Sequence, residues 1–180
     1  IDIDHMETYN NSSEEQEHAF LTFLRRLPFY GNAILYGDDA RITNIVPQLA
    51  RAITTYGLTE NNDFYAENIL QQGMETHFTV VRKNNAPLHV KLSLPGIHNV
   101  LNSLAAIAVA DICGISDIDK CKALTTFAGV ARRFQVLGRF DVENKNITIV
   151  EDYGHHPTEI DVTLNSARAV FVDKRIVLVF

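Results

Sequence analysis

The densest group of side chains that could do chemistry lies in residues 151–159, with the sequence Glu-Asp-Tyr-Gly-His-His-Pro-Thr-Glu. It offers carboxylates, a phenol and two imidazoles, and its glycine permits a tight turn. The segment follows a predicted strand and opens a predicted helix, which in an α/β fold is the edge where ligands bind. A metal-dependent hydrolase built on Asp152, His155 and His156 is one hypothesis, although adjacent histidines in an extended turn tend to diverge. The alternative is a plain strand-to-helix turn in which Asp152 and Thr158 form local hydrogen bonds.

Two further groups carry side chains suited to a nucleotide or a phosphate. Asn99 and Asn102 stand three residues apart at the start of a predicted helix, so both project from one face of its first turn, where their amides could hold a nucleotide. The alternative is that Asn99 only caps its own helix and Asn102 is solvated. Arg132 and Arg133 follow in a predicted linker, where a guanidinium could bind phosphate in a bidentate manner. Most arginines in linkers are simply solvated.

His5 is a further candidate, because its imidazole could serve a metal or a phosphate, whereas a lone histidine is more often a surface residue. No Gly-rich phosphate loop ending in Gly-Lys-Ser/Thr occurs in the 180 residues. A protein that uses ATP would therefore need a main part of its site outside this sequence. The chain begins without Met and ends inside an apolar run, so we expect a fragment of a longer chain.

The elements that must position these groups alternate between helical and extended patterns. Pro47 is expected to kink or break the second helix, and the turn residues 83–87 join two alternating runs, which predicts a hairpin. The predicted helices are residues 14–27, 39–52, 98–113, 117–127 and 157–170. The predicted strands are residues 33–36, 53–56, 76–82, 88–94, 147–151 and 175–180.

The order of these elements predicts the fold class and a boundary. Strand, helix and strand over residues 147–180 would form one βαβ unit, which is typical of an α/β protein. Residues 128–140 lie between a helix-rich part and this unit, and they are the best linker candidate. We therefore expect a domain boundary near residue 135.

The charge and the apolar pattern exclude several classes of partner. Sixteen Lys and Arg against 22 Asp and Glu give a net charge of −6, which argues against a nucleic acid or an anionic membrane as main partner. No apolar stretch approaches the roughly 18 residues that span a bilayer. We expect a soluble cytoplasmic protein in which Cys113 and Cys121 are reduced thiols.

Five motifs, taken in order, resemble those of the Mur ligase family. Any one of them is weak, but together they extend over essentially all 180 residues, and the last is the most specific. The motifs are Asp4–Tyr9, Leu27–Gly31, His98–Asn102, Gly129–Phe134 and Asp152–Glu159.

The resemblance implies an α/β fold built from a P-loop-type central ATPase domain and the start of a Rossmann-like carboxyl-terminal domain. Residues 1–135 would form the central ATP-binding domain, with its phosphate loop missing upstream. Residues 136–180 would form the first βαβ unit of the domain that binds the incoming amino acid. Because its ATP site would be incomplete, the fragment alone is expected to be inactive.

The resemblance also implies roles for individual side chains. His5 would ligate Mg²⁺ and would be catalytic together with Arg133, which would reach phosphate across the domain boundary. This implies a closure of the two domains. The remaining implied roles are ATP binding by Asn99, Asn102, Arg133 and Asp152, and substrate binding by Tyr153 and His155.

The implied reaction is ATP-dependent amide formation between the carboxylate of UDP-N-acetylmuramate and L-alanine, through an acyl phosphate, with ATP and Mg²⁺ as cofactors. Another member of the family attaches a preformed murein tripeptide to the same nucleotide sugar, and it tends to carry Ala where Gly154 stands. For the fragment alone, a non-catalytic nucleotide-binding module is a further alternative. Whether the protein forms a homodimer is left open.

Overall fold

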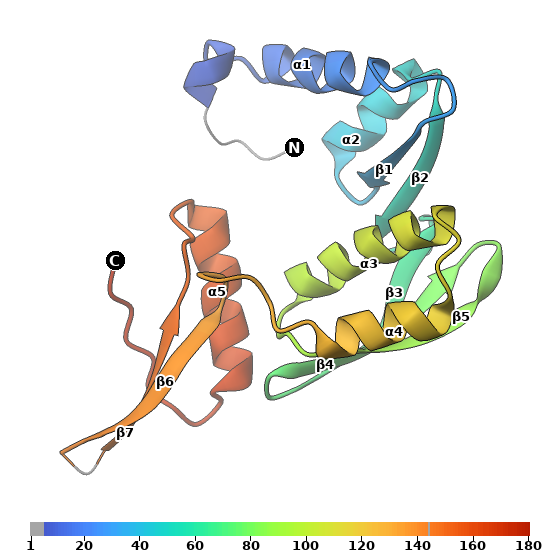
Figure 1. The fold of residues 1–180 in the computed structure, drawn as a ribbon. Coiled ribbons are helices and arrows are strands. Elements are labelled where there is room, and N and C mark those ends of the chain that lie inside the picture. Colours follow the sequence, from blue (N-terminus) through green and yellow to red (C-terminus); the bar gives the residue numbers. More distant parts are fainter. Residues whose placement is uncertain (1–5, 144) are drawn as a thin grey trace.

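The computed structural model describes residues 6–143 and 145–180, and its centre is a mixed five-stranded sheet (Figure 1). The strands lie in chain order; β1 pairs with β2 and β2 with β3 in parallel orientation, whereas β3 pairs with β4 and β4 with β5 in antiparallel orientation. Together with the helices that cover it, this sheet confirms the predicted α/β class. The strands are β1 (Asn32–Tyr36), β2 (Ala52–Gly57), β3 (Phe64–Gln72), β4 (Glu75–Arg82) and β5 (Asn85–Leu92).

The amino-terminal helices pack beside β1. After a 3-10 turn (η1, Met6–Tyr9), helix α1 (Ser13–Arg25) begins where Ser12 Oγ accepts a hydrogen bond from Glu15 N at 3.3 Å. Helix α2 (Ala40–Ile45) is shorter than the predicted helix over residues 39–52, because the chain tightens into a 3-10 turn that contains Pro47 (η2, Val46–Gln48). The buried apolar residues here are Leu21, Leu24, Ala33, Leu35, Ile42 and Ile45.

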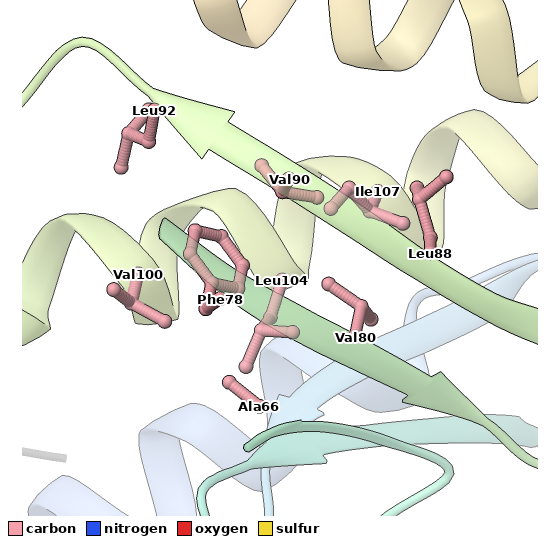
Figure 2. Packing of buried hydrophobic residues seen from close by; sticks show 9 residues of the cluster. All are labelled: Ala66, Phe78, Val80, Leu88, Val90, Leu92, Val100, Leu104 and Ile107. Carbon is pink, nitrogen blue, oxygen red and sulfur yellow. The ribbon is translucent and has the colours of Figure 1, made fainter. Parts of the chain in front are cut away.

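Helix α3 (Ile97–Ile112) contacts β1, β2 and β3, and helix α4 (Asp117–Thr126) contacts β5. Both helices lie within one residue of their predicted ranges. Val100 and Leu104 of α3 are fully buried, and burial of such a side chain stabilises the fold by roughly 1.5–3 kcal/mol. Figure 2 shows how these residues interdigitate with strands β4 and β5 in the main core. The longest apolar helix therefore anchors the segment that begins with Asn99.

Strand β3 was not predicted from the sequence, which indicated only a two-stranded hairpin over residues 76–94. A bulge lies in the β3–β4 pairing between Glu67 and Leu70, and Asn68 has φ +53°. A bulge breaks the alternation of apolar and polar residues on which strand prediction depends. Strand β3 becomes visible only through its pairing with β2 and β4.

The carboxyl-terminal part contains strands β6 (Gln135–Val142) and β7 (Lys145–Glu151), which within the described part of the chain pair only with each other, and helix α5 (Pro157–Val170). The predicted linker over residues 128–140 is therefore wrong from residue 135 onward, where the chain is a strand. The predicted strand over residues 175–180 is also wrong, because this segment has no pairing partner among the described residues and the side chains of residues 177–180 are exposed. The described residues therefore do not complete the predicted βαβ unit. The β7 strand and the α5 helix form as predicted, the helix with identical bounds.

Two expectations concern features outside the sheet. Cys113 and Cys121 are free thiols, as predicted. None of the helices in residues 6–143 and 145–180 is long and apolar enough to cross a membrane.

Candidate nucleotide-binding site

A cavity of about 800 Å³ lies between the sheet-bearing part of the chain and the part that carries α5. Four residues with roles implied by the family resemblance line it: Asn99, Asn102, Arg133 and Asp152. They come from the first turns of α3, the segment before β6 and the end of β7, so only the tertiary fold brings them together.

The wall of this cavity is mainly apolar, with a few polar groups. Its apolar residues come from β5, α3, α4 and the segment after α4, and they include Leu92, Leu94, Ala106, Leu124, Phe127 and Val130. Such a lining is typical of sites for small organic ligands, in which the polar groups fix orientation. The cavity is therefore suited to a small organic ligand that combines apolar and polar or charged groups.

Asn99 has a local bond as well as a place on the cavity wall. Its Nδ2 donates to the Pro95 carbonyl oxygen at 2.7 Å. The N-cap of α3 is Gly96, which has φ +93° and no side chain to cap with. Asn99 thus stabilises the start of its own helix, as the simpler interpretation held, although from inside the first turn. Asn102, one turn further on, is exposed on the wall of the cavity.

Asp152 ties the end of β7 to the turn that carries Arg133. Its Oδ2 accepts a hydrogen bond from Phe134 N at 2.8 Å, and its Oδ1 accepts one from Gly154 N at 2.7 Å. The turn is unusual, because Arg132 and Phe134 both have positive φ angles, +61° and +46°. Such backbone costs free energy and needs bonds that hold it. Asp152 therefore stabilises the loop conformation in which Arg133 lines the cavity.

Glu159 joins Arg133 to the start of α5. Its Oε1 lies 3.2 Å from Arg133 Nη1, and its Oε2 accepts hydrogen bonds from the backbone N–H groups of His155 and His156 at 3.1 and 3.4 Å. The hydrogen bond from His155 N lowers the pKa of Glu159, and Arg133 adds to this shift. The spacing of Glu159 from His156 fits a capping box, which the structure contains.

His98 also lines the cavity and was assigned no role from the sequence. Its Nδ1 is buried without a hydrogen-bond partner. Burial lowers the pKa of His98, the charge of Arg133 lowers it further, and Asp152 acts in the opposite direction. The imidazole is thus held toward its neutral form at the cavity wall.

Tyr153 and His155 lie outside the cavity lining and form a cluster of their own. Their rings make an edge contact with centroids 5.4 Å apart, and the Arg132 guanidinium stands 4.4 Å from the Tyr153 centroid. Both side chains are about half exposed, Tyr153 at 52% for the residue and His155 at 55% for the side chain. The two residues are therefore available to a ligand that approaches the outer surface of the 151–159 segment.

His5 lies outside the described residues. In the part of the chain that the structure describes, no three His, Cys, Asp or Glu side chains gather as a group that could hold a metal ion. The hypothesis of a metal-dependent hydrolase built on Asp152, His155 and His156 therefore gains no support from the described residues.

Comparison with known proteins gives matches along the whole chain. The Mur ligase middle domain matches residues 1–110, and the Mur ligase glutamate ligase domain matches residues 132–180. A UDP-N-acetylmuramate–L-alanine ligase from Hydrogenovibrio crunogenus is 49% identical over all 180 residues, which correspond to 39% of that relative.

Solved structures share the fold. The UDP-N-acetylmuramate-alanine ligase from Thermotoga maritima has a TM-score of 0.76 at 31% identity, over 95% of this chain and 37% of that protein. A murein peptide ligase from Psychrobacter arcticus has a TM-score of 0.66 at 33% identity, over 88% of this chain and 33% of that protein. The chain thus spans less than half the length of these relatives. Since the middle domain alone matches more than half of its residues, the chain belongs to the Mur ligase family.

Proposed function

We propose that this chain is the central part and the beginning of the carboxyl-terminal part of an ATP-dependent ligase that joins UDP-N-acetylmuramate to L-alanine in peptidoglycan precursor synthesis. The observation that carries the proposal is the meeting of Asn99, Asn102, Arg133 and Asp152 on one cavity. The names of the relatives from Hydrogenovibrio and Thermotoga support the same substrates. Because ATP and a nucleotide sugar are consumed, we place the protein in the cytoplasm.

The proposed division of labour follows the two parts of the chain. Residues 1–135 form the central ATP-binding domain, and residues 136–180 begin the domain that binds the amino acid. We assign the adenine ring to the apolar wall beside Asn99 and Asn102, since an apolar pocket with amide groups suits a heterocycle. The phosphates point toward Arg133, whose fork of donors matches phosphate oxygens.

The chemistry begins with a carboxylate that is a poor electrophile. A carboxylate oxygen of the sugar attacks the terminal phosphorus of ATP, ADP leaves, and an acyl phosphate forms. The alanine amine then attacks the acyl carbon, and the tetrahedral intermediate expels inorganic phosphate. Negative charge on the transferred phosphoryl group must be neutralised in both steps, and we assign this role to Arg133, which Glu159 orients.

Mg²⁺ is the proposed metal, with His5 as its proposed ligand. The residues that the structure describes include no group of metal-binding side chains that would complete such a site. We therefore derive no step that depends on the metal from the described residues.

The position of Gly154 favours alanine over a preformed tripeptide as the acceptor. A Cβ at this position would lie 2.9 Å from Asp152 Oδ1 and 3.2 Å from Glu159 Cβ. An Ala at this position, which the resemblance associates with the tripeptide-adding member of the family, would press on both residues that hold the Arg133 turn. The 33% identity to the murein peptide ligase nevertheless makes this reaction the second candidate.

An isotope experiment tests the proposed activation of the carboxylate. UDP-N-acetylmuramate carrying ¹⁸O in its lactyl carboxylate is turned over by the full-length protein with ATP and L-alanine. We expect the released inorganic phosphate to contain one ¹⁸O atom, detected by mass spectrometry, because the acyl phosphate donates that oxygen to phosphate. Unlabelled phosphate would exclude the acyl phosphate route.

Asn102→Ala is expected to lower kcat/KM for ATP more than about tenfold, because it removes an amide from the cavity wall. Steady-state kinetics of the full-length ligase measures this effect. Asn165→Ala is the matched control, since Asn165 lies exposed on α5 and bonds Asp161. Equal kinetics for the two variants would exclude Asn102 from nucleotide binding.

His155→Ala is expected to raise the KM for L-alanine by about two- to tenfold with little change in kcat, as expected for loss of one hydrogen bond to the acceptor. The measurement is the initial rate against L-alanine concentration at saturating ATP. His77→Ala is the control, because His77 lies on β4 outside the cavity lining and its side chain is 40% exposed. An unchanged KM for L-alanine in His155→Ala would refute the role in acceptor binding.

A further inference from the structure

Helix α5 meets the Pro95–Gly96 turn at a contact that leaves no room for a side chain on Gly96. A Cβ at Gly96 would lie 2.4 Å from Ser166 Oγ and 2.7 Å from His98 Cε1. Ser166 is only 4% exposed, so the contact is closed to solvent. The turn belongs to the sheet-bearing part and Ser166 to the carboxyl-terminal part, so this contact joins the two parts that enclose the cavity.

Ser166 acts at this contact through its small size. Its hydroxyl donates to the Val162 carbonyl oxygen at 2.9 Å, within its own helix. The helix therefore presents a short side chain whose polar group is already bonded, and it packs against bare backbone at Gly96. A longer side chain at position 166 could not approach the turn as closely.

The turn itself is held from two sides. The Gly96 N–H donates to Gln71 Oε1 of β3 at 3.1 Å, and the Pro95 carbonyl oxygen accepts from Asn99 Nδ2 at 2.7 Å. The φ of +93° at Gly96 is a conformation that residues with a Cβ rarely adopt. The turn is thus a fixed surface of the central part, against which α5 stops.

The face of α5 that reaches this turn also faces the cavity. Glu159, Val162 and Thr163 line the cavity, and Ser166 follows at helical spacing on the same face. Glu159 lies 3.2 Å from Arg133. A displacement of α5 at Ser166 therefore moves the group that orients Arg133.

We propose that the Gly96–Ser166 contact is the stop that sets the angle at which the carboxyl-terminal part docks on the central part. Gly96 and Ser166 are then positioning residues for Arg133 and Asp152. The expected effect on turnover rests on the proposed ligase function, whereas the docking itself can be measured without any turnover.

The first test measures the docking geometry in the full-length protein. Native cysteines are replaced, and spin labels are placed at Lys83→Cys and Arg168→Cys, which are exposed positions on the central part and on α5. Electron–electron distance measurements are made with and without ADP. Ser166→Leu is expected to lengthen and broaden the distance distribution. Ser166→Ala and the bulk-matched control Ala169→Leu, at an exposed site on α5, are expected to retain the parent distribution.

Each outcome decides the proposal. A Ser166→Leu distribution equal to that of the parent overturns it, and so does a parent distribution as broad as that of Ser166→Leu. Where Ser166→Leu does not fold, Ser166→Thr adds a single carbon and is expected to give a smaller shift in the same direction.

The second test separates positioning from a general loss of stability. Ser166→Leu is expected to lower kcat about tenfold at temperatures well below its melting temperature, as misplacement of catalytic groups does, with unchanged affinity for UDP-N-acetylmuramate. A kcat loss that follows the melting temperature contradicts positioning. If the parent protein shows no ligase turnover, the proposed function fails and the distance measurement still decides the docking contact.

Discussion

Arg133→Ala is expected to lower kcat of the full-length ligase by at least about 100-fold, which is the scale on which loss of one electrostatic stabiliser acts in enzymes. The guanidinium lines the cavity, held 3.2 Å from Glu159 by a turn with positive φ angles. Removal of the guanidinium leaves the phosphoryl group without the charge that we assign to its neutralisation. The measurement is single-turnover formation of ADP at saturating substrates.

The neighbouring arginine supplies the control. Arg132 has the same side chain and the adjacent position, but it lies over Tyr153 and near Glu151, not on the cavity wall. Arg132→Ala should therefore lower kcat much less than Arg133→Ala does. Arg133→Lys keeps the positive charge and loses the bidentate fork, so its kcat should lie between those of Arg132→Ala and Arg133→Ala. An equal or larger loss in Arg132→Ala would contradict the proposed role of Arg133.

Asp111→Ala is expected to lower the free energy of unfolding of the α3–α4 region by about 3–5 kcal/mol, the usual effect of removing one partner from a buried ion pair. Asp111 is 10% exposed and contacts Lys120 and Arg82, whose side chains are 5% and 3% exposed. Arg82 also pairs with Asp117 through two bonds of 2.8 Å, and hydrogen bonds from Arg82 hold the pKa of Asp117 well below its usual range. Without Asp111, two buried cations share one partly exposed carboxylate.

Amide hydrogen exchange of α3 and α4 in the full-length protein measures this loss locally. Glu75→Gln is the control, because Glu75 pairs with Lys91 at 2.8 Å on the surface, with both side chains 43% exposed. Pairs of this kind contribute little to stability. If the amides of α3 and α4 are protected from exchange equally well in Asp111→Ala and in Glu75→Gln, the buried network does not stabilise these helices.

The elements predicted correctly are those with local signals. Helix α5 has the predicted bounds because Pro157 opens it and a capping box holds its first turn. Ser12 and Ser116 likewise cap α1 and α4 through their side chains, which are local signals of the same kind. Strand β3 was not predicted because a bulge interrupts its alternation of apolar and polar residues. Strand β6 was not predicted because it follows a segment rich in Gly and Arg that is typical of a linker. Residues 175–180 show the reverse error, because this apolar run has no pairing partner among residues 6–143 and 145–180 and so forms no strand.

The candidate site divides in a similar way. The motifs predicted nucleotide-binding roles for Asn99, Asn102, Arg133 and Asp152. The structure places all four on one cavity. Their catalytic and binding roles stay predictions. Glu159 and His98 were overlooked because their importance depends on packing between distant segments, which no local pattern reveals.

The most direct test of the central proposal is the release of ADP by the full-length protein with UDP-N-acetylmuramate and either L-alanine or L-Ala-D-Glu-diaminopimelate as acceptor. We expect turnover with L-alanine, with formation of the corresponding amide product. Turnover only with the tripeptide would assign the protein to the second candidate reaction. The absence of turnover with both acceptors would contradict the ligase assignment and favour a nucleotide-binding role without catalysis.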